Sequence, residues 1–186
     1  MSENENKEVI FSKKVIEFIT VANEYCLFIE KTEGYPREDI IDYMLKICPL
    51  IYLKGALLPE CDEDDFEIAE RYVTEEHWEA VFKPLQSKFA TDDLYHYAKQ
   101  NDQGEYIVQE ASIADNLSDV YQDLKDFIML FQKGSIAAKQ NAVAECRSLF
   151  ETHWGLKIIS AHRALHQIIF KETGDVNTSE SAGELE

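Results

Sequence analysis

Three histidines near the carboxyl end of the chain have the residue type and spacing that can bind a metal ion. His162 and His166 are four residues apart, so a helix projects both from one face, and His153 falls within a neighbouring apolar stripe. Together with Asp123 they could hold a metal that activates a bound water, which makes a metal-dependent hydrolase the alternative function. Arg163 follows His162, so the H-E-x-x-H pattern is absent. Buried, hydrogen-bonded histidines are the favoured interpretation.

Four aspartates recur at helical spacing between residues 113 and 132. They fall largely opposite the apolar residues of the same segment, which predicts a solvated helix face rather than a set of metal ligands. Asp123 lies nearest the apolar boundary and is kept as a candidate for a pocket. The four are Asp115, Asp119, Asp123 and Asp126.

Other catalytic patterns are absent from the sequence, which contains no G-x-S-x-G, no P-loop and no G-x-G-x-x-G. Cys146 lies seven positions before His153, about 10 Å along a helix, which is too far for the histidine to activate the thiol. No C-x-x-C pair occurs among the four cysteines, so we predict small core residues and no cofactor. These cysteines are Cys26, Cys48, Cys61 and Cys146.

The charge of the chain excludes some partners. Its 186 residues include 36 acidic and 18 basic ones, a net charge of -18, which disfavours direct binding to nucleic acid or to anionic lipid. Residues 60–79 hold ten acidic side chains against Arg71 alone. This segment is the candidate surface for a basic protein partner, with solubility as the alternative explanation. The candidate partner-binding residues are Asp62, Glu63, Asp64 and Asp65.

Apolar residues spaced by three and four positions predict the helices that must position these groups. Pro49 is expected to kink or end the second helix, and Gly155 either separates the last two helices or bends one long helix. Tyr106–Val108 reads as one short extended piece. The predicted helices cover 7–31, 36–51, 75–82, 113–132, 135–154 and 156–171.

These elements predict an all-α fold: a single domain over residues 1–172, mainly an antiparallel bundle of five to seven helices, with a flexible acidic tail over 173–186. The amino terminus is polar and acidic, unlike a secretory leader. The longest mostly apolar run, 47–58, is too short to cross a bilayer. A cytoplasmic location without membrane binding is expected.

Several segments resemble a bacterial family catalogued as domain of unknown function 5063. The family commonly carries a histidine two positions after its His-Trp-Gly motif, where this chain has Lys157, and this difference weakens a metal or catalytic role. The resemblance implies an all-helical cytosolic bacterial protein and no particular activity. The matching segments are 73–76, 92–95, 119–125, His153-Trp154-Gly155 and Ala164-Leu165-His166.

The recognisable segments predict a shared pocket or structural cluster of Asp123, His153, Trp154, His162 and His166. In a structural cluster His153 would donate to Asp123 or to a helix carbonyl and lock two helices in register. Trp154 would close the end of the bundle with its indole N–H near water. Because no catalytic motif withstands these tests, the leading function is a non-enzymatic interaction or regulatory module.

Overall fold

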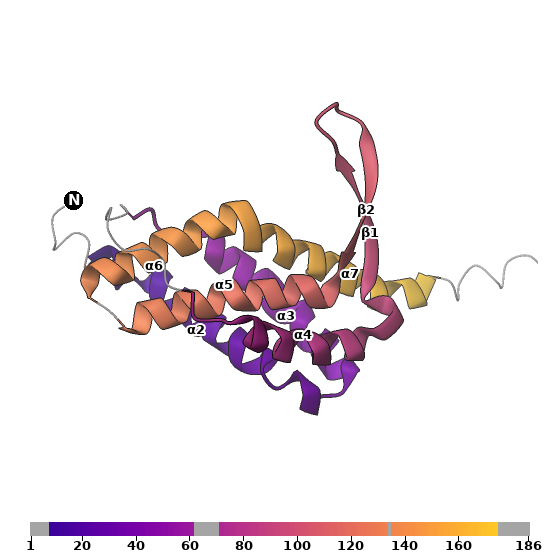
Figure 1. Ribbon diagram of the computed structural model, residues 1–186, viewed down its shortest axis with the longest axis horizontal. Helices are drawn as coiled ribbons and strands as arrows, with labels where there is room; N and C mark the ends of the chain where they lie inside the picture. The colour runs from indigo at the N-terminus through magenta and orange to yellow at the C-terminus, as the bar shows by residue number, and fades with distance from the viewer. Residues whose placement is uncertain (1–7, 62–70, 134, 175–186) are drawn as a thin grey trace, which may run out of the picture.

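The computed structural model describes residues 8–61, 71–133 and 135–174 (Figure 1). The mainly helical bundle predicted from the sequence is confirmed, but the all-α class is an overstatement because two strands form a small antiparallel sheet. Most of the predicted tail, 175–186, lies outside the described residues, and the single-domain boundaries stay a prediction. The helices are α2 (Lys13–Ile29), α3 (Arg37–Ala56), α4 (Glu75–Phe89), α5 (Ile113–Lys133), α6 (Ile136–Leu149) and α7 (Gly155–Gly174), and the strands are β1 (Leu94–Gln100) and β2 (Tyr106–Ser112).

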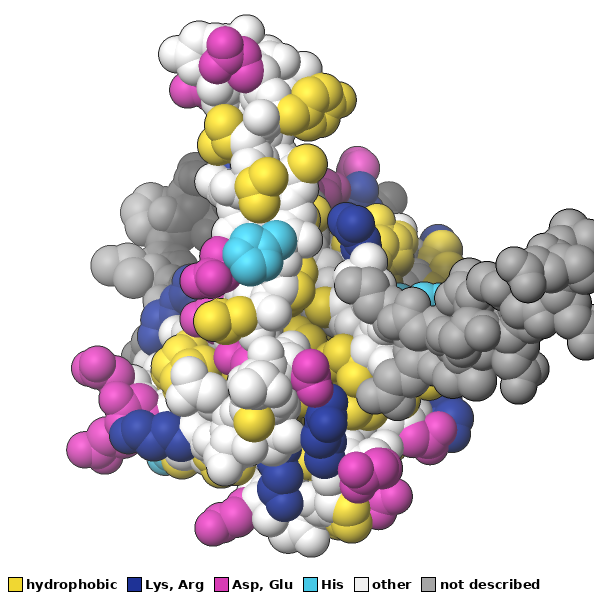
Figure 2. All heavy atoms as spheres, turned by 90° about the vertical axis from the view of Figure 1, so that its right-hand side faces the viewer, with side chains coloured by type: hydrophobic (Ala, Val, Ile, Leu, Met, Phe, Trp, Pro, Cys, Tyr) yellow, Lys and Arg dark blue, Asp and Glu magenta, His cyan; other side chains and the backbone are white. Residues whose placement is uncertain are grey.

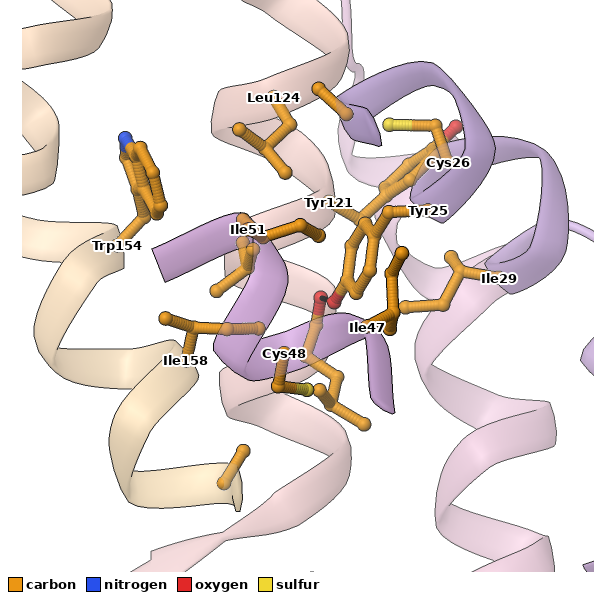
Figure 3. Packing of buried hydrophobic residues seen from close by; sticks show 14 of the residues in the cluster. Tyr25, Cys26, Ile29, Ile47, Cys48, Ile51, Tyr121, Leu124, Trp154 and Ile158 are labelled. Atoms are coloured by element: carbon orange, nitrogen blue, oxygen red, sulfur yellow. Dashed lines mark hydrogen bonds between the residues drawn. The ribbon is translucent and has the colours of Figure 1, made fainter. Parts of the chain in front are cut away.

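Helix α5 lies at the centre of the bundle and contacts α2, α4, α6 and α7. Side chains from α2, α3, α5 and α7 meet in one core, where Figure 3 labels Tyr25, Ile51, Leu124 and Ile158. The buried Tyr25 hydroxyl donates a 2.7 Å hydrogen bond to a backbone carbonyl of α5, and burial raises the pKa of Tyr25 well above its usual value. Because α5 packs against helices on more than one side, polar residues opposite one packed face can still be covered by another helix.

Side-chain caps mark the starts of two helices. Thr74 and Ser135 cap α4 and α6, each accepting a hydrogen bond from a first-turn backbone N–H. Pro49 does not end its helix, because α3 continues to Ala56.

Gly155 does not separate two helices. Residues 150–154 form a π-helical segment, η3 (Phe150–Trp154), which joins α6 to α7 in one continuous helical rod. Gly155 keeps right-handed helical angles, and a Cβ there would lie 2.2 Å from the Phe150 carbonyl oxygen. The close approach of the Phe150 carbonyl oxygen in this π-helical segment therefore requires glycine at position 155.

Trp154 contradicts the prediction that it closes the bundle end with its indole near water. The side chain is fully buried, and its Nε1 donates a 3.0 Å hydrogen bond to the Cys146 carbonyl oxygen. Phe18 stacks on the ring at 5.8 Å between centroids. A Cβ on Gly55 of α3 would lie 2.3 Å from the indole, so this glycine makes room for the ring. Trp154 thus continues the buried stripe of α7, four residues before Ile158 and seven before Ala161.

The predicted single extended piece at Tyr106–Val108 is a full antiparallel ribbon of two seven-residue strands. Its register runs without a bulge from Leu94 opposite Ser112 to Gln100 opposite Tyr106. The turn between the strands contains Gly104 at a φ of 82°, where glycine is favoured. The ribbon stands away from the helices (Figure 1).

Candidate functional site

The α5 aspartate row, Asp115, Asp119, Asp123 and Asp126, is not the solvated face predicted from the sequence. Asp123 and Asp126 are buried, and Asp119 is largely covered. The prediction was wrong because it assumed one core-facing side, whereas α5 packs against four other helices. Each member of the row contacts basic or N–H groups from other parts of the chain, so the row connects segments that are distant in sequence.

Asp123 bridges two of these segments. Its Oδ2 lies 2.6 Å from Nδ1 of His153, and its Oδ1 accepts a 3.3 Å hydrogen bond from Arg71. The contact between His153 and Asp123 expected from the sequence is therefore present. Because this carboxylate is buried, its two partners compensate for the loss of water around it.

Asp126 holds the segment that precedes α4. Its Oδ1 accepts hydrogen bonds of 2.8 Å from the backbone N–H groups of both Tyr72 and Val73. Burial raises the pKa of the Asp126 carboxyl, an effect opposed by these two hydrogen bonds and by Arg71. The hydrogen bonds and Arg71 thus stabilise the ionised Asp126 carboxylate, whereas the loss of solvating water destabilises it.

Lys157 occupies the position where the family resemblance led us to expect a histidine, and it contacts the other two aspartates of the row. It pairs with Asp119 and, at 3.6 Å, with Asp115, while Trp78 of α4 donates a 2.9 Å hydrogen bond to Asp119. Burial would lower the pKa of Lys157, but the contacts with Asp119 and Asp115 raise it above its usual value. A cation therefore already sits where a divalent ion would need open carboxylate oxygens.

The space beside Asp123 is too small for a substrate. The hollow lined by Asp123, Cys146 and Leu149 has a volume of about 10 Å³, room for roughly one water molecule. Cys146 is buried, and burial raises the pKa of its thiol well above the usual value, so it is not a reactive thiolate. This part of the row is suited to bracing helices rather than to binding a small molecule.

His162 and His166 do not join His153. They lie nine and thirteen positions further along the same continuous helical rod, about 13 and 20 Å away by helical rise, far beyond the reach of one metal ion. His166 is exposed and packs on Phe170, and burial together with His166 lowers the pKa of His162. Among the residues that the structure describes, no group of three or more His, Cys, Asp or Glu side chains is placed to hold a metal.

The four acidic residues proposed to bind a basic partner are not among the residues that the structure describes. Asp62, Glu63, Asp64 and Asp65 lie outside the described residues, so partner binding through them stays a prediction.

The β1–β2 ribbon is a candidate binding surface that the sequence did not single out. Tyr106 and Val108 are 75% and 73% exposed, and Leu94 is 54% exposed. Figure 2 shows hydrophobic side chains along the ribbon where it rises from the helical body. Aromatic and β-branched residues on both sides of a Gly-containing turn were the available indication of a hairpin. Exposed apolar side chains on a projecting element are typical of an interaction surface.

The base of the ribbon is fixed to the start of α5. Buried Asp93 accepts hydrogen bonds from the Ala114 backbone N–H at 2.8 Å and from the Ser112 hydroxyl at 2.7 Å. The Ser112 oxygen in turn accepts a hydrogen bond from the backbone N–H of Asp115. Above this base, Asn116 donates a 2.6 Å hydrogen bond to the Tyr95 hydroxyl. The direction of the ribbon is therefore set by the helical body.

Replacing Asp93 with alanine is expected to lower the free energy of unfolding by about 1–2 kcal/mol, because it removes a buried helix cap. It should also speed hydrogen exchange of the ribbon amides, since the ribbon loses its fixed base. Asp92→Ala is the matched control, because Asp92 is exposed and makes a surface ion pair with Arg37. Equal losses in the two variants, measured by urea unfolding, would contradict the anchoring role.

The fold and these sites define the class: a mainly helical bundle braced by a partly buried aspartate row, with a projecting β-ribbon. The chain belongs to the family described as Domain of unknown function (DUF5063), whose family model matches residues 9–171, and this confirms the resemblance noted in the sequence. It is similar to the crystal structure of protein BF1032 from Bacteroides fragilis, at 41% sequence identity and a TM-score of 0.76. The match covers 86% of this chain and 94% of that one.

A comparison with curated proteins gave no match. In the described ranges, no helix combines the length and apolar character needed to cross a membrane.

Proposed function

We propose that this protein is a non-enzymatic interaction module that binds another protein chain through the β1–β2 ribbon. The observation that carries the proposal is the ribbon itself, a pair of strands that extends from the helices with Tyr106 and Val108 exposed. A two-stranded ribbon is only marginally stable in water, and an added strand or covering surface stabilises it. The exposed ribbon can therefore pair with an extended strand of a partner protein, which would add to the sheet.

The anchoring of the ribbon supports the same function. Asp93 and Asn116 fix its base, so the ribbon loses less conformational freedom on binding than an unanchored hairpin would. The hydrolase alternative lacks comparable support, because its three histidines are spread along one rod and the hollow at Asp123 holds about one water. Binding of a basic partner by the acidic segment remains a separate prediction, as do the cytosolic location and bacterial origin.

A photo-crosslinking side chain tests this function in the cells that naturally express the protein. We expect covalent adducts to a protein chain when the crosslinker replaces Tyr106, on the ribbon. The matched control replaces Tyr52, which is a tyrosine exposed on the helical body. Adducts from the body position alone, or from neither position, would overturn the ribbon as the binding surface.

A further inference from the structure

The outer edge of β2 has few of the features that keep strand edges from pairing. Its sequence from Tyr106 to Ser112 contains one charged residue, Glu110, and no lysine, proline or glycine. Its pairing with β1 is continuous, so no bulge twists the edge away. By contrast, β1 carries Lys99, a residue type that commonly protects an edge. The two edges of the ribbon are therefore unequal, and β2 presents the open one.

Exposure is concentrated in the half of β2 that is farther from the body. Tyr106 and Val108 project on one face of the ribbon and Ile107 on the other, and all three are exposed. Towards the base, Ala111 and Ser112 are half-buried. The open edge and the exposed apolar side chains thus coincide at 106–108, a segment that is accessible to a second strand.

We propose that the partner of this edge is a second copy of the chain, so that two β2 strands pair antiparallel about a two-fold axis at Val108. This inference rests on the proposed function, and it names the partner. The two-fold places Val108 opposite the partner's Val108, and Tyr106 opposite the partner's Glu110, with no like charges directly opposed. The two ribbons then form one four-stranded sheet, which meets the stability requirement that two strands alone do not.

The charge of -18 on each chain does not oppose this arrangement. Each strand has seven residues and is about 24 Å long, and antiparallel pairing places the two helical bodies at opposite ends of the shared sheet. The bodies are then separated by more than the screening length of about 8 Å at physiological ionic strength. Repulsion between them is therefore largely screened, and moderate salt is expected to strengthen the dimer.

Solution mass measured over a range of protein concentrations tests the pairing in the full chain. We expect a concentration-dependent shift from the 21.5 kDa monomer mass to twice that value. Val108→Lys puts two ammonium groups at the two-fold axis and should weaken the dimer by about tenfold or more. The matched control is Ala98→Lys, because Ala98 lies directly across from Val108 on β1 and is also exposed. This variant should dimerise like the unmodified chain.

A disulfide trap keeps the test decisive if Val108→Lys disturbs the ribbon. Val108→Cys, made with Cys61→Ser to remove the half-buried native thiol, should form a covalent dimer on mild oxidation. Ala98→Cys in the same background should stay monomeric. Monomers at all concentrations, or equal trapping at both positions, would overturn the second-copy proposal. If the crosslinker at position 106 then captures only a different protein in cells, the proposed binding function stands and self-pairing fails. If no adduct forms from the ribbon, both the binding function and the self-pairing fail.

Discussion

Replacing Trp154 with alanine is expected to lower the free energy of unfolding by about 3–5 kcal/mol. The indole is fully buried, stacks on Phe18, and makes an edge contact with Phe150 at 4.9 Å between centroids. Its removal leaves a cavity between α3 and η3 and leaves the Cys146 carbonyl without its indole donor. Urea unfolding measures the loss. Leu156→Ala is the control, because this neighbour is 69% exposed and should change stability by less than about 0.5 kcal/mol.

A double-mutant cycle with Gly55 isolates the contact between the two helices. Gly55→Ala alone should cost about 1–3 kcal/mol, because the added methyl group meets the indole at 2.3 Å. In the Trp154→Ala background the same change should cost less, since the ring is gone and only the Phe150 side chain, 2.9 Å from the added methyl group, still has to shift. Additive losses would show that the packing of α3 on η3 does not depend on this pair.

The helices could be predicted from the sequence because their formation depends on nearby residues. Three-four spacing located the helical segments, and the Thr74 and Ser135 side chains marked two starts through bonds to residues only three positions away. The buried positions of α5 are different. Asp126 is buried because backbone groups at 72 and 73, more than fifty residues earlier, reach its carboxylate. A helical wheel contains no information about such partners.

The ribbon and the indole were missed for related reasons. The exposed faces of β1 and β2 are not patterned against a core, so the apolar-polar alternation that identifies a half-buried strand is weak. Trp154 was assigned to the wrong surroundings because its indole N–H was expected to need water, whereas the Cys146 carbonyl oxygen accepts its hydrogen bond inside the bundle. Conversely, Asp123 was one of the two partners predicted for His153, because both residues lie in segments with recognisable sequence motifs, and the structure shows that contact.

The partners of the α5 aspartate row give it a structural explanation that is independent of the ribbon. Lys157 and Trp78 meet at Asp119, which joins α7 and α4 through α5. The ribbon leads into the amino-terminal end of the same helix, which Asp93 caps. The α5 aspartate row thus holds in place the helix to which the ribbon is attached. Substitutions in the row should therefore change stability, whereas substitutions of exposed ribbon residues should change binding.

Asp126 provides the sharpest test of this bracing. Asp126→Ala leaves two backbone N–H groups unpaired and should lower the free energy of unfolding by about 2–4 kcal/mol. Asp126→Asn keeps one acceptor oxygen and removes a charge that burial disfavours, so it should cost no more than about 1 kcal/mol. Asp42→Asn is the surface control, because Asp42 pairs only with the exposed Lys46 in the described structure. Equal losses for the alanine and asparagine variants would contradict the role of the two hydrogen bonds.

The pH dependence of the same variants follows from the raised pKa of Asp126, which burial causes. The native carboxyl keeps its proton to a higher pH than the unfolded one, whose pKa is 3.8, so the native state binds more protons in this window. The stability contributed by Asp126 therefore falls as pH rises from 3.8 through the native pKa. Unfolding free energies measured across this window should show the unmodified chain losing stability relative to Asp126→Asn as pH increases. A constant difference, or one of the opposite sign, would show that burial of this carboxylate does not control its protonation.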